Sequence, residues 1–190
     1  MKLKAIRPLC FLFAAVVCSS GVFAQSDAKK PADDKRSPII KETEFNWKRA
    51  KKWTLDYIDA MPENAMSFKP TPEVRSFAEQ MLHLAYWNYG IGEMVGGKTN
   101  PYGKKQEDLE KRDDVKAKAA LRKVVEESYD NLLVTVAGMN EAKLLEQVQF
   151  FNQKMTRLGV LVIALDHQTH HRGNTTLYLR LKGVTPPPEP

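Results

Sequence analysis

Three of the chain's four histidines lie in one segment, LVIALDHQTHHRG, from Leu161 to Gly173. The apolar run before them contains no helix-breaking residue, and on a helix His171 lies about 40° from His167 and one turn further along. Side chains four residues apart are neighbours on a helix, so both imidazoles can reach one metal ion. The residues that share their stripe are Val160, Ile163, Ala164, Asn174 and Tyr178. The pair therefore lies on a mostly apolar face, where an imidazole needs a partner and a metal ion is a suitable one.

A second interpretation treats these histidines as hydrogen-bonded core residues, because two ligands do not make a metal site. A third ligand would have to be His83, the one histidine outside the segment. His170 offers a competing pair, since it lies about 60° from His167 at a spacing of three residues. The spacing favours His167 with His171 and leaves His167 with His170 as the alternative.

The first 24 residues have the three parts of a secretory signal peptide. Lys2, Lys4 and Arg7 form a basic start, Leu9–Val17 forms an apolar core, and small residues precede a cleavage point after Ala24. We therefore expect a periplasmic or secreted protein with no membrane segment after cleavage. A retained N-terminal anchor is the alternative, although the apolar run is short for a membrane span.

Cleavage after Ala24 would also change the chemistry of the chain. Both cysteines, Cys10 and Cys18, would be lost, so the mature chain would have no disulfide or thiol chemistry. Its formal charge would fall from +6 to +3, because three basic residues are removed. The remaining basic residues are interleaved with acidic ones, which is typical of a solvated surface, and we expect no nucleic-acid partner.

Four segments of the remaining chain have apolar residues at helical spacing. Their approximate bounds are Thr43–Met61, Ser76–Gly97, Asp114–Met139 and Thr156–Lys182. Residues 25–41 have the composition of a flexible polar tether, residues 98–112 form a charged connection, and residues 140–152 fit a turn or a short strand. Residues 184–190 form a proline-rich tail. These segments predict an all-α protein, an antiparallel four-helix bundle over residues 42–183.

The last predicted helix is apolar nearly all round in its first half. Leu158, Leu161 and Leu165 lie opposite the histidine stripe. One face could therefore pack in the core and the other, with Leu158, Leu161 and Leu165 on the outside, against a second subunit, which predicts a homodimer. A wholly internal helix is the alternative.

The sequence resembles the DinB-like family, which includes the YfiT-like metal-dependent hydrolases. The resemblance runs from Glu42 to Pro187 and is most specific in KMTRLGVLVIALDHQTHHRGNTTLYLRLKGVTPPP, from Lys154 to Pro188, and in FKPTPEVRSFAEQMLHLAYW, from Phe68 to Trp87. The family's histidine ligands correspond to His83, His167 and His171. The resemblance implies a four-helix bundle that holds one divalent ion and acts as a hydrolase, or a related transferase, on a small molecule.

The resemblance and the helical spacing suggest further site residues. Glu79 lies one turn before His83 and is the candidate general base, although it is also placed to form a capping box with Ser76. Tyr86 and Trp87 are candidates for lining a substrate pocket. Asn174 stands where the family has glutamine, one turn beyond His171, and is a third candidate for substrate binding.

Two functions remain open from sequence alone. Imidazole ligands favour zinc or nickel over manganese or iron, and such an ion could activate water for hydrolysis. The alternative is a non-catalytic envelope or stress protein in which the ion holds two helices together. An open pocket at the ion would favour the enzyme, and a closed, dry site would favour the structural role.

Overall fold

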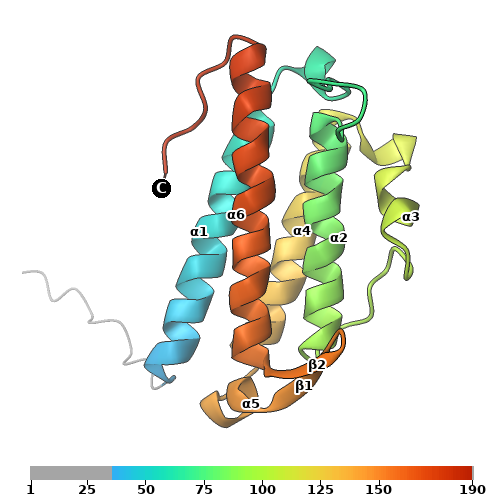
Figure 1. Ribbon diagram of the computed structural model, residues 1–190. Helices are drawn as coiled ribbons and strands as arrows, with labels where there is room; N and C mark the ends of the chain where they lie inside the picture. The colour runs from blue at the N-terminus through green and yellow to red at the C-terminus, as the bar shows by residue number, and fades with distance from the viewer. Residues whose placement is uncertain (1–35, 190) are drawn as a thin grey trace, which may run out of the picture. The chain divides into compact units, whose positions relative to one another are not determined.

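The computed structural model describes residues 36–189 and is mostly helical (Figure 1). Its four long helices are α1 (Pro38–Ala60), α2 (Phe77–Met94), α4 (Lys118–Ala137) and α6 (Arg157–Leu181). Helix α2 packs against α4 and α6, and α1 packs against the same two helices. The expected signal peptide and most of the expected tether lie outside the described residues.

Shorter elements connect the long helices. They are η1 (Glu63–Ala65), α3 (Gln106–Glu110), η2 (Asp113–Val115), α5 (Glu141–Leu145), β1 (Gln147–Phe150) and β2 (Gln153–Thr156). The two strands pair antiparallel, so the all-α expectation is wrong in this detail. Helix α3 was also not expected, because five residues in a charged connection give no periodic signal.

Local side-chain contacts set where the helices begin. Ser76 and Glu79 form a complete capping box at the start of α2, and the Thr156 hydroxyl accepts a hydrogen bond from the Gly159 N–H at the start of α6. Helix α1 begins at Pro38, whose missing N–H costs nothing at a first helical position. The end of the expected tether, residues 38–41, is therefore helical.

The β1–β2 hairpin has an aromatic residue in an unusual backbone conformation at its turn. Phe150 pairs with Gln153, and between them Phe151 has a φ of 50°. A bulky residue in this left-handed region costs on the order of 1–3 kcal/mol and persists only where its surroundings hold it. Figure 1 shows the hairpin across the ends of α2 and α6.

The core between the long helices is largely apolar but contains a buried polar network around Gln168. Gln168 of α6 accepts a hydrogen bond from the Tyr129 hydroxyl at 2.7 Å and donates one to Asn88 Oδ1 at 2.8 Å. The Tyr129 hydroxyl also contacts the Thr54 hydroxyl at 2.9 Å. Side chains from all four long helices are thus tied together beside the predicted histidines.

The surface expected for a second subunit is only partly exposed. Leu161 is 1% exposed and belongs to the core of its own chain, and Leu158 and Leu165 are half-buried. Placing Leu161 in a dimer surface was therefore wrong, because α6 is packed by α1 on that side. No described helix has both the length and the hydrophobicity that a membrane crossing requires.

We expect Gln168→Leu to destabilise the protein by on the order of 2–3 kcal/mol, because it leaves buried partners of the glutamine without a hydrogen bond. Denaturant unfolding measures this change. Gln147→Leu, at an exposed strand position, is the matched control and should change stability by less than about 0.5 kcal/mol. Equal effects of the two substitutions would contradict the network's role.

Candidate metal centre

His83 from α2 meets His167 and His171 from α6 at one point in the interior. One ring nitrogen from each histidine lies within 4.8 Å of the others. The ring centroids are 5.1 Å apart for His83 and His167, 4.3 Å for His83 and His171, and 4.4 Å for His167 and His171. His170 is exposed and contacts Asn174 instead, so the pair spaced by four residues is the one that converges.

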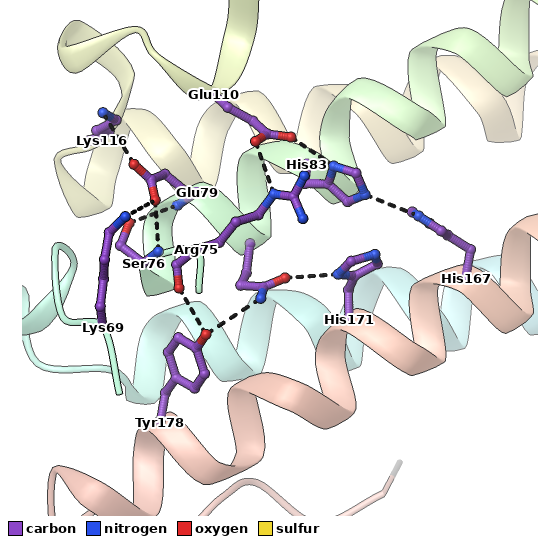
Figure 2. Close-up of polar contacts among 11 residues, drawn as sticks. Lys69, Arg75, Ser76, Glu79, His83, Glu110, Lys116, His167, His171 and Tyr178 are labelled. Carbon is purple, nitrogen blue, oxygen red and sulfur yellow. Dashed lines mark hydrogen bonds and ion pairs between the residues drawn. The ribbon is translucent and has the colours of Figure 1, made fainter. Parts of the chain in front are cut away.

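A carboxylate from the short helix α3 fixes His83. The His83 Nδ1–H donates to Glu110 Oε1 at 2.7 Å, and Arg75 Nε donates to the other carboxylate oxygen at 2.9 Å (Figure 2). Burial alone would raise the pKa of Glu110, but the hydrogen bonds from His83 and Arg75 outweigh it and hold the pKa below its usual value. Glu110 is therefore an ionised acceptor, which keeps the proton of His83 on Nδ1.

A second chain of hydrogen bonds fixes His171. Its Nδ1–H donates to Gln80 Oε1 at 2.8 Å, and the Gln80 amide N–H donates to the Tyr178 hydroxyl at 3.4 Å. The Tyr178 hydroxyl donates to the Arg75 carbonyl oxygen at 2.8 Å (Figure 2). Both chains therefore end on Arg75, one on its side chain and the other on its backbone.

These partners determine which nitrogens are free to bind a metal ion. With Nδ1–H committed in His83 and in His171, each ring presents an unprotonated Nε2. His83 Nε2 lies 3.1 Å from His167 Nε2. Two nitrogens bound to one zinc ion at 2.0–2.1 Å in a tetrahedron would lie about 3.3 Å apart. The three imidazoles therefore suit a divalent ion that prefers nitrogen ligands, and the His83–His167 pair already has close to the spacing that such an ion requires.

His167 is the least constrained of the three. Among the described residues its Nδ1 is buried and has no hydrogen-bond partner. Because His83 Nε2 is an acceptor, the 3.1 Å contact requires His167 to donate its Nε2–H when no ion is bound. His167 must therefore carry its ring proton on Nδ1 instead before Nε2 can bind a metal ion.

Burial keeps the two histidines of α6 uncharged. This burial, together with repulsion from the neighbouring His83 ring, lowers the pKa of His167 to about 4 and that of His171 to about 3. Near neutral pH each of these two rings is therefore uncharged and carries a single ring proton. Neutral imidazole is the form that ligates metals.

The other predicted site residues have different surroundings. The Glu79 carboxylate accepts from the Ser76 N–H and pairs with Lys69 and Lys116, which is the structural role rather than that of a base beside the histidines. Trp87 does line the site, with its ring centroid 5.3 Å from that of His167. Tyr86 packs against Trp87, at 6.5 Å between ring centroids. Asn174 contacts the exposed His170.

The residues that sequence reasoning missed are the partners of the ligands, namely Arg75, Gln80, Glu110 and Tyr178. Gln80 and Tyr178 lie on the same helical stripes as the histidines, so their positions were available as a signal. Glu110 was not detectable, because nothing in a charged connection indicates which carboxylate folds back onto α2.

The sequence model of the DinB family matches residues 42–189 of this chain. The uncharacterized protein YjoA of Bacillus subtilis is 26% identical over 136 residues, which cover 70% of this chain and 83% of YjoA. Its solved structure, described as a DinB-like protein, superposes with a TM-score of 0.60 at 19% identity, covering 77% of this chain and 95% of that one.

A second solved structure, a DinB-like protein from Bacillus cereus, gives a TM-score of 0.67 at 18% identity and covers 78% of this chain and 96% of that one. At these identities the structural likeness establishes the fold alone.

The lowered pKa values of His167 and His171 predict how the stability of the metal-free protein depends on pH. Their unfolded-state pKa is about 6.5, so between about pH 6.5 and pH 4 the unfolded chain binds more protons than the folded one. The stability that these two neutral histidines contribute is fully present above about pH 6.5 and is lost as the pH falls through this window. Thermal midpoints measured in chelator from about pH 7.5 to pH 4.5 should therefore fall.

A paired substitution isolates this effect from general acid destabilisation. In His171→Gln the new amide can still donate to Gln80 but does not titrate, so the midpoint should fall less steeply than in the wild type. His170→Gln, on the exposed neighbour, should keep the wild-type slope. Identical slopes in all three proteins would show that the buried rings do not cause the pH dependence.

Proposed function

Because this chain belongs to the DinB family, we propose that it binds one divalent metal ion through His83, His167 and His171. This proposal rests on which way the ring N–H groups of His83 and His171 point. Two rings donate Nδ1–H outward to Glu110 and Gln80, which leaves their Nε2 lone pairs for a shared cation.

The donor set also favours particular ions. Three neutral imidazoles suit zinc or nickel, whereas manganese and iron would be held less tightly by the same ligands. We further infer that the four long helices form an antiparallel four-helix bundle of the DinB type, with the metal held between α2 and α6.

We propose that the protein is a metal-dependent hydrolase that acts on a small molecule. A bound divalent ion supplies Lewis acidity, which polarises a carbonyl or phosphoryl oxygen and lowers the pKa of water. Glu110 holds the Nδ1 proton of His83 and so orients the ring and increases its basicity as a ligand. The half-exposed side chain of His167, which faces a cavity, supports access of a substrate to the site.

A structural metal site is the second candidate, supported by the origin of the ligands on two different helices. An ion shared by α2 and α6 would hold these helices together without chemistry. The cavity beside His167 favours the enzyme, because a structural site is normally closed by four protein ligands. Export remains a proposal that rests on the first 24 residues of the sequence.

We expect the wild-type chain to bind one zinc ion, and His83→Ala, His167→Ala and His171→Ala each to lose stoichiometric binding, because two imidazoles hold an ion far less tightly than three. Isothermal titration calorimetry of the metal-free proteins measures this. His170→Ala is the matched control and should bind as the wild type does. Loss of binding in His170→Ala together with retention in His171→Ala would contradict the assignment.

Replacing the partner of a ligand should weaken binding without abolishing it. In Glu110→Gln the hydrogen bond from His83 can persist but the negative charge is lost, so zinc affinity should fall about 10-fold to 100-fold. Glu79→Gln makes the same change in a residue that caps α2, and a glutamine still fits a capping box, so the affinity should be unchanged. A larger loss in Glu79→Gln than in Glu110→Gln would reverse the two roles.

A further inference from the structure

A cavity of about 130 Å³ opens beside the histidine cluster, between α2, α6 and the β1–β2 hairpin. The residues that line it are Trp87, Ile91, Phe150, Phe151, Ile163, Ala164, His167 and Gln168. His167 belongs both to this lining and to the three converging imidazoles, so a molecule in the cavity lies directly against the metal centre.

Three aromatic side chains form the wall from the hairpin to His167. The Trp87 ring centroid lies 5.3 Å from that of His167 and 6.0 Å from that of Phe151, and the Phe150 and Phe151 rings are 4.8 Å apart. The hairpin that the sequence did not specify therefore completes the cavity, and it does so with side chains that prefer apolar partners.

The lining has few polar groups: the Gln168 amide, the His167 ring of the metal centre, and the Trp87 indole N–H, which is buried and has no hydrogen-bond partner among the described residues. Among the side chains described in residues 36–189, no Asp, Glu, Lys or Arg lines the cavity. Gln168 accepts from Tyr129 and donates to Asn88, so its amide is used within the core. A charged group placed here would lose its hydration and gain no partner of opposite charge in the described part of the chain.

The size of the cavity matches a small apolar group. A dry cavity of about 150 Å³ lined by Leu, Ile and Phe binds benzene in another protein. We propose that this cavity binds an uncharged aromatic or branched-alkyl group of a substrate whose own oxygen atom coordinates the metal at His83, His167 and His171. This inference rests on the proposed function and adds the chemical class of the substrate.

A substitution of Phe151 can change the cavity wall with little effect on folding. Its side chain is 65% exposed, so the core loses little when it is removed, yet its φ of 50° is a conformation that an aromatic residue rarely adopts. The hairpin holds Phe151 against Trp87 despite this strain, and an outlier of this kind is expected where a side chain serves a binding site.

The test compares two chelators that differ only in the group offered to the cavity. Benzohydroxamate and acetohydroxamate both bind a metal through the same two oxygens and carry a phenyl and a methyl group respectively. Titrated by calorimetry into the zinc-loaded full chain, benzohydroxamate should bind about tenfold more tightly, or more, because the ring is buried. In Phe151→Ala this preference should fall at least about threefold.

Phe45→Ala is the matched control, since Phe45 is also 65% exposed but lies on α1, which contributes no lining residue. It should keep the wild-type preference. Equal affinity of the two hydroxamates, or a preference that Phe151→Ala leaves intact, would overturn the inference while the open metal site stands. Zinc binding with no binding of either hydroxamate would instead remove the proposed function, and the inference with it.

Discussion

The site depends on how buried imidazoles find partners for their protons. A neutral imidazole has one N–H and one lone pair, and both are costly to leave unpaired away from water. His83 and His171 direct their N–H groups outward to Glu110 and Gln80, so their lone pairs point inward. An arrangement with lone pairs gathered at one point and donors fixed around it is complementary to a cation.

Arg75 ties these outer contacts together. Its guanidinium group holds Glu110 and its carbonyl oxygen accepts from Tyr178, so the orientation of both outer partners depends on the chain just before α2 (Figure 2). The capping box at Ser76 fixes that same point in the chain. His167 lacks such support and faces the cavity, so the centre combines two preorganised ligands with one whose ring proton must move from Nε2 to Nδ1 when it binds.

Much of this arrangement follows from short-range patterns in the sequence. The spacing of His167 and His171 on a long apolar segment predicts that they converge, and their ring centroids lie 4.4 Å apart. The capping box of Ser76 and Glu79 was also predictable, and its formation explains why Glu79 is not a free base. Four long helices were expected, with ends a few residues from those observed.

What could not be predicted depends on contacts between residues distant in sequence. Glu110 reaches His83 only because the connection after α2 folds back as α3, and no periodicity reports that path. Leu161 was placed outward because helix α6 is apolar on several faces, and only the packing of α1 decides which of them is buried. A turn or a short strand was expected within residues 140–152, but not the pairing of β1 with β2, since the sequence has no glycine to indicate a tight hairpin turn at Phe151.

X-ray absorption spectroscopy at the zinc edge of the loaded chain tests the central claim most directly, because it counts the ligands around the ion. The account predicts three imidazole nitrogens at about 2.0–2.1 Å, completed by oxygen from water or another small molecule. A first shell with two or fewer imidazoles, or one completed by a fourth protein ligand, would contradict an open three-histidine centre between α2 and α6.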